Sequence, residues 1–304
     1  MRPAFIHAKL HLFLINGIII LYKNNLKSQK ERADKISVNQ KLTGYQIVYF
    51  SHGGGPLPLL NDPSHYRMNN FMESLPSLIR RPEAIVVISA HWEEYEVTVQ
   101  SGGSPAMLYD YYGFPKETYE IQYLAKGEPN LAAKILDALK INNIPCKADN
   151  ERGFDHGLFI PLMMMYPKAD IPCFQVSLLH SLNEEEHINL GKALSSLKDE
   201  NVLIIGSGFS FHNMMQFSFK DKDQDTRNEA FQDWLIEICT SDITQETREE
   251  KMIHWTSAPN ARYCHPRSEH LLPLHVCVGA AGRKAELVFD NYIAGKRAVA
   301  FLWR

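Results

Sequence analysis

Histidine is the residue type whose number and spacing in this chain suggest chemistry. The 304 residues include 13 histidines, and imidazole is both the commonest metal ligand and a side chain that exchanges protons near neutral pH. His52 and His91 directly follow the apolar runs IVYFS and AIVVISA, and His212 comes a few residues after VLIIGSG. A histidine near a strand end is usually structural when it occurs alone. The repetition predicts that these side chains, together with His270, hold one divalent metal ion.

Two histidines stand close to the start of apolar stretches with helical character. His156 lies in GFDHG, and His270 lies in HPRSEHLLPL. The positive end of a helix dipole disfavours imidazolium, so such a histidine tends to stay neutral and available as a ligand or proton acceptor. Two plainer readings remain open: Asp155 as an N-cap only and His270 as a surface residue. Structural or solvent roles are expected for His65, His180, His187, His254 and His275.

The elements that must position these histidines alternate along the chain. Short β-branched runs predict strands at residues 47–51, 84–90, 173–179 and 202–208, and helical spacing predicts helices at residues 68–80, 131–142, 184–198 and 227–239, the third capped by Asn183. This alternation predicts one three-layer α/β/α domain around a mostly parallel sheet. Ligands bind outside the carboxyl ends of the strands in such sheets, so histidines far apart in sequence can meet there.

The bulk composition excludes some function classes. A content of 45% hydrophobic and 22% charged residues is ordinary for a globular domain, and the net charge of −3 gives no basic footprint for a nucleic-acid partner. The five cysteines form no CxxC pair, which favours a reducing, cytoplasmic location.

Residues 1–43 differ from the rest of the chain. An apolar stretch at residues 10–22 is followed by a polar, basic one at residues 23–41. The apolar run is shorter than the ~20 residues that span a bilayer, so no stable membrane insertion is expected. We expect a poorly ordered extension, with membrane association as the alternative, followed by a catalytic domain at residues 44–304.

Five ordered motifs, SHGGGP, ISAHW, GFDHG, GSGFSFHN and HPRSEHLLPL, resemble those of class III extradiol dioxygenases of the LigB type, in particular the DOPA-dioxygenase-like branch. The similarity runs from about Tyr45 to Arg304. It implies a LigB-like fold and an oxidoreductase that opens a catechol-type ring, DOPA-like or related, with O2. A small aromatic diol and O2 are then the expected partners, and the oligomeric state stays open.

The resemblance also implies a set of metal ligands. His52 and His91 match the first two ligands, and His270 matches the third in the DOPA-dioxygenase-like branch. Glu269 competes with His270, because other LigB-type enzymes use a glutamate there. The GGGP sequence after His52 departs from the shorter HGSP form of many relatives, which changes the loop beside the substrate pocket.

Two further roles come from the same resemblance. His212 matches the catalytic base, sometimes counted as a fourth ligand, and His156 matches a histidine that assists the substrate or oxygen. Aromatic residues beside the motifs are candidates for pocket walls, with core packing as the alternative. These candidates are Trp92, Phe154, Phe209 and Tyr263.

The implied cofactor is one divalent metal per chain, with iron(II) expected for activity and zinc(II) as the alternative. Three protein ligands on iron(II) leave positions open for both a vicinal diol and O2. Imidazoles also suit zinc, so a zinc-dependent hydrolase is one competing hypothesis. A non-catalytic, Memo-like binding protein on the same fold is the other.

Overall fold

A computed structural model describes residues 45–219, 222 and 224–304. The predicted extension, residues 1–43, lies outside these ranges. Within them, no helix combines the length and the apolar character needed to cross a membrane.

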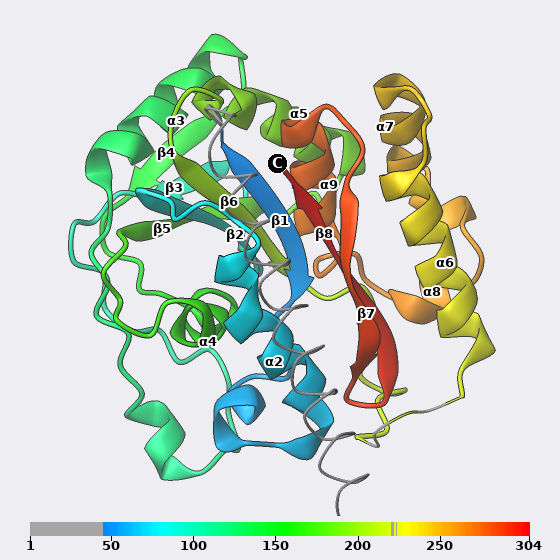
Figure 1. Ribbon diagram of the computed structural model, residues 1–304. Coiled ribbons are helices and arrows are strands. Elements are labelled where there is room, and N and C mark those ends of the chain that lie inside the picture. The colour runs from blue at the N-terminus through cyan, green and yellow to red at the C-terminus, as the bar shows by residue number, and fades with distance from the viewer. Residues whose placement is uncertain (1–44, 220–221, 223) are drawn as a thin grey trace, which may run out of the picture. The chain divides into compact units, whose positions relative to one another are not determined.

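A mixed sheet of eight strands forms the centre of the described domain (Figure 1). The strand order is β4-β3-β5-β2-β6-β1-β8-β7. Parallel pairs join β5, β2, β6 and β1 at the centre, whereas β8 runs antiparallel to β1 and to β7. The strands are β1 (Gln46–Ser51), β2 (Ala84–Glu94), β3 (Val97–Gln100), β4 (Cys146–Asp149), β5 (Cys173–Leu179), β6 (Val202–Gly208), β7 (Glu286–Ile293) and β8 (Lys296–Trp303). The predicted α/β domain with a mostly parallel sheet is confirmed.

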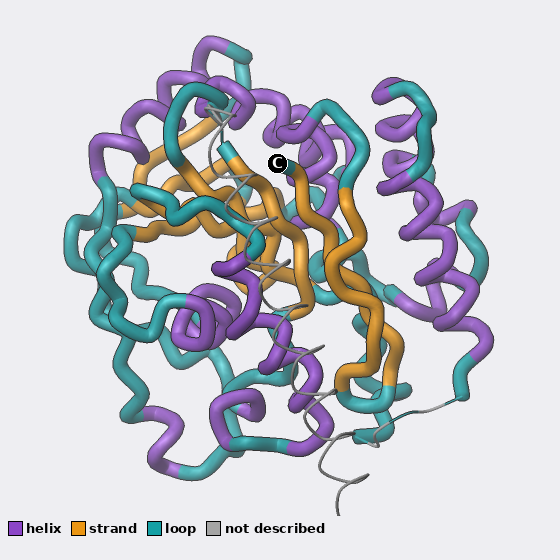
Figure 2. The backbone as a smooth tube through the Cα atoms, in the orientation of Figure 1, coloured by secondary structure: helices purple, strands orange, loops and turns teal. Residues whose placement is uncertain are grey.

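Helices surround the strands, as Figure 2 shows by colour. They are α2 (Tyr66–Ser74), α3 (Pro129–Ile141), α4 (His156–Met165), α5 (Glu184–Leu194), α6 (Thr226–Thr240), α7 (Gln245–Ile253), α8 (Ala261–Cys264) and α9 (Leu272–Ala281). The predicted cap of α5 is present, because the Asn183 side chain accepts a hydrogen bond from the Glu186 amide. The predicted helix at residues 68–80 is shorter in the structure, since a 3-10 turn containing Pro76 follows Ser74.

Two neighbouring residues of β6 show that helices cover both faces of the sheet. The Ser207 hydroxyl donates to the carbonyl of Gly157 in α4. At Gly206, a Cβ atom would lie against Pro273 and Cys277 of α9. Successive strand residues point to opposite faces, so α4 and α9 form opposite layers around the sheet.

Close backbone contact joins α5 and α9. A Cβ atom added at Gly191 would lie 2.1 Å from the Val276 carbonyl oxygen, and one at Gly279 would lie 2.2 Å from that of Ile188. Glycine at both positions allows the two helices to approach this closely. The same layer reaches the sheet, since α9 packs against β6 and β1.

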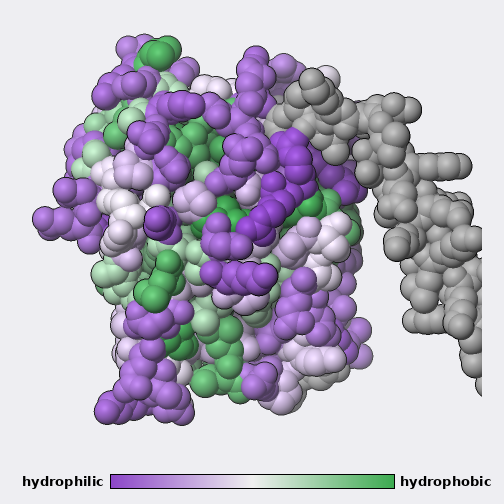
Figure 3. Space-filling view, turned by 60° about the vertical axis from the view of Figure 1, so that its left-hand side comes forward, coloured by the Kyte–Doolittle hydropathy of each residue, from purple (hydrophilic) through white to green (hydrophobic). Residues whose placement is uncertain are grey.

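The surface mixes residue types. On the face seen in Figure 3, hydrophilic residues cover most of the surface, and hydrophobic residues lie in groups between them. This mixture is ordinary, because apolar atoms contribute much of the accessible surface of any folded domain.

Candidate functional site

Three neighbouring strands each deliver a histidine to the same end of the sheet. His52 directly follows β1, and its amide donates to the Gly208 carbonyl at the end of β6. His91 lies inside β2, which continues past the predicted end because its pairing with β5 shifts register between Ile88 and Glu93. His212 follows β6 by four residues. The order β2-β6-β1 therefore brings these three histidines together.

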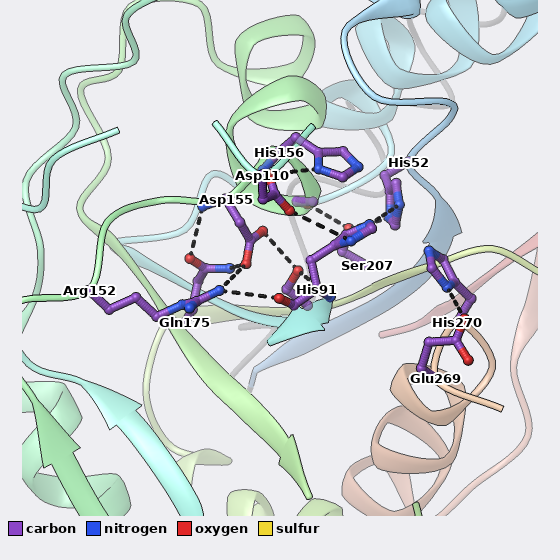
Figure 4. A network of polar contacts seen from close by, with 12 residues as sticks. His52, His91, Asp110, Arg152, Asp155, His156, Gln175, Ser207, Glu269 and His270 are labelled. Atoms are coloured by element: carbon purple, nitrogen blue, oxygen red, sulfur yellow. Dashed lines mark hydrogen bonds and ion pairs between the residues drawn. The ribbon is translucent and has the colours of Figure 1, made fainter. Parts of the chain in front are cut away.

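Two helix-flanking segments complete the cluster (Figure 4). His156 is the first residue of α4, and His270 lies two residues before α9. The His270 carbonyl accepts hydrogen bonds from the Phe209 amide and the Tyr49 hydroxyl. A Cβ atom at Gly208 would lie 2.1 Å from that carbonyl oxygen, so this approach requires glycine.

The five rings are close together. The ring centroid of His52 lies 4.8 Å from that of His91, 5.3 Å from that of His156 and 5.4 Å from that of His270. The centroid of His91 lies 4.9 Å from that of His270 and 3.9 Å from that of His156. His212 stacks on His270 at 3.4 Å. The structure thus brings together the five histidines to which the resemblance gives a role.

Hydrogen bonds settle which nitrogen of His52 faces the cluster. The Ser207 hydroxyl gives its proton to the Gly157 carbonyl at 2.5 Å, so it accepts from Nδ1 of His52 at 3.1 Å. This bond places the ring proton on Nδ1 and leaves a lone pair on Nε2. Nε2 of His52 lies 2.9 Å from Nε2 of His91.

Nδ1 of the other two predicted ligands, His270 and His91, also faces a carboxylate. Nδ1 of His270 lies 2.9 Å from Oε1 of Glu269, and Nδ1 of His91 lies 3.6 Å from Oδ2 of Asp110. Metal-binding histidines commonly use one ring nitrogen on a carboxylate or hydroxyl in this way, which orients the other nitrogen.

Burial keeps these imidazoles neutral. Loss of hydration, followed by the neighbouring histidines, holds the pKa of His52 and of His91 well below its usual range. Burial likewise lowers the pKa of His270 to about 3. Neutral imidazole is the form that binds a metal ion, so the site favours the state a metal needs.

Glu269 bridges two histidines from outside the ring cluster. Its Oε1 lies 2.9 Å from Nδ1 of His270 and 3.0 Å from Nδ1 of His212. Although burial opposes ionisation, hydrogen bonds from both rings hold the pKa of this carboxyl well below its usual range. The carboxylate therefore acts as an acceptor for both rings.

Asp110 is a site residue that the sequence patterns do not reveal. Its Oδ1 accepts from Nδ1 of His156 at 2.8 Å and from the His156 amide at 3.0 Å. It comes from the segment between β3 and α3, which has no periodic pattern, and nothing near it in sequence marks it.

A buried polar network supports His91 from behind (Figure 4). The carboxylate of Asp155 accepts from Ser89 Oγ at 2.8 Å, Gln175 Nε2 at 2.7 Å and Arg152 Nη2 at 3.0 Å. Ser89 Oγ in turn accepts from the His91 amide at 3.2 Å. Asp155 occupies the N-cap position of α4 without a side-chain cap bond, so its carboxylate serves this network instead.

His65 is a second residue whose place the sequence does not predict. It is fully buried, and its Nε2 accepts from the Gly54 amide at 3.1 Å. It thereby holds the glycine-rich loop that follows His52. Nothing in the sequence of the helix that follows His65 indicates this contact with Gly54.

Possible metal-binding atoms fall into two groups among the residues described. One group is His52, His91 and His156, and the other is His212, Glu269 and His270, with the ligand atoms of each group within 4.8 Å of one another. The predicted set of His52, His91 and His270 takes members from both groups. Their rings remain adjacent, at centroid distances between 4.8 and 5.4 Å.

A cavity of about 400 Å³ opens over the cluster. The five histidines and Asp110 form its polar part. Most of the remaining lining residues are apolar or aromatic, and they include Leu57, Tyr111, Phe114, Phe209, Phe217 and Phe219. A space of this size and lining suits a small flat ligand.

Three of the predicted pocket walls lie elsewhere. Trp92, Phe154 and Tyr263 are not among the described residues that line the cavity. Phe154 is fully buried in the core, and the guanidinium of Arg152 lies 4.4 Å from the Trp92 ring. The Tyr263 hydroxyl donates to Asp225 at 2.6 Å. These aromatic rings therefore serve packing and polar contacts, whereas Phe209 does line the cavity.

Comparison with known proteins gives a consistent picture. Residues 51–301 match the family described as the catalytic LigB subunit of aromatic ring-opening dioxygenase. The chain is 35% identical over 277 residues to dioxygenase tasH of Hapsidospora irregularis, covering 84% of this chain and 85% of that protein. It is 39% identical over 255 residues to 4,5-DOPA dioxygenase extradiol of Beta vulgaris, covering 82% and 92%. The crystal structure of uncharacterized protein JW3007 from Escherichia coli K12 superimposes with a TM-score of 0.69 at 26% identity, covering 85% of this chain and 99% of that one.

Proposed function

The chain belongs to the LigB family of aromatic ring-opening dioxygenases, and from that premise we propose that it opens a catechol-type ring, DOPA-like or related, with O2 at one iron(II) ion. The family inferred from the five motifs is confirmed, and with it an oxidoreductase of the extradiol, metal-dependent kind. The substrate, the identity of the metal and the roles of single residues are the proposal.

One observation carries the assignment of His52, His91 and His270 as the metal ligands. Nδ1 of His52 and Nδ1 of His270 are hydrogen-bonded to a hydroxyl and a carboxylate, and Nδ1 of His91 lies 3.6 Å from the Asp110 carboxylate, so Nε2 of each ring remains for a shared ion. Neutral imidazole is a ligand that iron and zinc both accept. We assign Glu269 to the outer side of His270, because its Oε1 lies against two ring nitrogens and its Oε2 lies 3.4 Å from Nη1 of Arg267.

When bound, the metal would bring the diol and O2 together on its open positions. Ring opening inserts both atoms of O2 as the bond between a diol carbon and its unhydroxylated neighbour breaks. One oxygen ends in a carboxylic acid and the other in an aldehyde or ketone. The ring supplies the electrons that reduce O2, so no further reductant is needed, and the diol protons must be held and returned.

His212 and His156 are the residues we assign to proton handling. Glu269 occupies Nδ1 of His212, and Asp110 occupies Nδ1 of His156. Both rings line the cavity, so Nε2 is the nitrogen that each would present to the substrate. Imidazole can take a proton from a diol hydroxyl and return it at neutral pH. His212 would act as the base, and His156 would hold the diol or oxygen.

Oxygen uptake tests the proposal. Protein purified without air is reloaded separately with iron(II) and with zinc, then given DOPA, caffeate, protocatechuate and catechol. Uptake that depends on iron, together with a coloured ring-opened product, is the expected result. Tight metal binding without uptake on any catechol would instead favour the zinc hydrolase or the Memo-like binding protein.

A further inference from the structure

We propose that the ring substituent of the substrate is uncharged and apolar, which favours related catechols over DOPA, caffeate and protocatechuate, whose substituents carry a carboxylate. This inference rests on the proposed function, because it assumes that the diol faces the histidines. The substituent then meets the remaining residues that line the cavity, and these residues decide which substituents bind.

The polar residues that line the cavity are close together. Each of the five histidine rings contacts at least one other, and Asp110 approaches His91 and His156. The remaining lining consists of Gly53, Gly54 and Gly55 together with apolar and aromatic side chains. A diol oriented toward the histidines therefore directs its substituent toward carbon atoms.

No lysine or arginine occurs among the described residues that line the cavity. Arg152 is engaged by Asp155 at 3.0 Å, and Arg267 is engaged by Glu93 at 2.6 Å. A carboxylate on the substituent would lose water without gaining a cation, which is costly in an apolar site.

Two polar groups that line the cavity, on Tyr111 and Asp110, are already occupied. The Tyr111 hydroxyl donates to the Thr118 carbonyl at 2.5 Å. The Asp110 carboxylate accepts from the amide and Nδ1 of His156, and its negative charge would repel a second carboxylate nearby. A carboxylate therefore finds few partners among these residues, whereas an alkyl, alkenyl or ester group can pack against their apolar surface.

Apolar side chains continue to the mouth of the cavity. Met214, Phe219 and Tyr112 line it while remaining 67%, 55% and 91% exposed. Large exposed hydrophobic residues that gather at one opening commonly mark a surface that a ligand covers. A substituent that extends beyond the aromatic ring of the substrate would bury these three side chains. Extended apolar substituents therefore fit the mouth of the cavity.

Binding without turnover tests the inference directly. The iron(II)-loaded protein is titrated without O2 against 3-(3,4-dihydroxyphenyl)propanoate and against its methyl ester, a pair that differs in charge at one end. We expect the ester to bind at least about ten-fold more tightly. A Kd for the acid equal to or lower than that of the ester would overturn the inference. Admitting O2 afterwards tests the proposed function separately, since failure to open either ring contradicts that function and leaves the order of affinities standing.

A matched pair of variants tests whether the substituent lies at the mouth of the cavity. Met214→Arg places a cation at the mouth and should shift the ratio of the two Kd values toward the acid by about ten-fold. Met215→Arg is the control, because Met215 is 87% exposed and is not among the described residues that line the cavity. If the ratio of the two Kd values is unchanged in Met214→Arg, or shifts equally in Met215→Arg, the substituent does not lie at the mouth of the cavity.

Discussion

Nε2 of His52 and Nε2 of His91 lie 2.9 Å apart. Nitrogens that share one metal ion at ~2.1 Å are separated by about 3.0 to 3.4 Å, depending on the coordination angle. The polypeptide alone therefore holds these two atoms near the spacing that a metal requires.

Substitution of either histidine should remove the metal. We expect His52→Ala and His91→Ala to lose both bound metal and ring opening, whereas His212→Ala should keep most of its metal and lose ring opening. Metal content measured on the purified proteins and oxygen uptake give the two readouts. Equal metal loss in all three variants would make His212 a ligand.

The roles of Glu269 and His270 can also be distinguished by substitution and measurement of metal binding. Because Glu269 orients His270 through Nδ1, Glu269→Gln should weaken metal binding by about 10- to 100-fold. His270→Ala should abolish binding at the concentrations used. Metal affinity measured by competition with a chelator distinguishes the two, and stronger loss in Glu269→Gln would reverse the assignment.

Stability should fall in mild acid because buried histidines are held neutral. In His187, Nδ1 donates to the Asn183 carbonyl and Nε2 accepts from the Leu179 amide, and burial lowers the pKa to about 4. An unfolded histidine titrates near ~6.5, so the unfolded chain takes up the proton first as the pH falls. The free energy of unfolding should therefore decrease between about pH 6.5 and 4, by about 1.4 kcal/mol per pH unit for this residue.

Urea unfolding of metal-free protein at several pH values measures this slope. His187→Gln is the control, since glutamine can accept from the Leu179 amide but does not titrate. In this variant, the free energy of unfolding should decrease less steeply between about pH 6.5 and 4. Parallel profiles for the two proteins would mean that His187 is not the source.

The contact between α5 and α9 should be intolerant of a single methyl group. Gly191→Ala would force a Cβ atom against the Val276 carbonyl oxygen, and we expect a loss of about 1–3 kcal/mol in the free energy of unfolding. Gly103→Ala is the matched control, because the nearest neighbour of a new Cβ atom there is Cγ of Pro129, at 3.8 Å. Thermal or urea unfolding gives the comparison, and equal stability of the two variants would contradict the tight crossing.

Deletion of residues 1–43 should leave ring opening intact. Every residue assigned a role at the site lies between His52 and His270, within the described domain. Oxygen uptake by the shortened and the complete chain, both loaded with iron(II), should agree. An inactive but folded truncated protein would show that the extension contributes to the site.

Burial explains why four of the strands can be predicted from the sequence. Strands β1, β2, β5 and β6 are fully or largely buried, so their apolar runs stand out. By contrast, β4 and β7 are short or half-exposed and carry mixed residues, so the sequence patterns do not reveal them. Long-range pairing, rather than local preference, decides such segments.

The residues of the candidate site also differ in how far the sequence predicts them. Strand ends point to His52, His91 and His212, whereas the order of the motifs was needed to give roles to His156 and His270. Aromatic type alone could not separate the cavity walls from the core. Trp92 and Phe154 lie near the motifs in sequence, yet the cavity walls come from loops such as the one carrying Tyr111 and Phe114.

The order of the strands also has a consequence for how the domain forms. Among the strands described, β7 and β8 are the pair joined by a short turn, at Ala294 and Gly295, whereas β1 pairs with β6 and with β8 at the far end of the chain. Closing such long loops costs entropy before any contact rewards it, so we expect slow folding. If His52 and His270 hold the metal as proposed, the site is complete only after His270 has been synthesised, so we expect metal binding to be a late step in the formation of the domain.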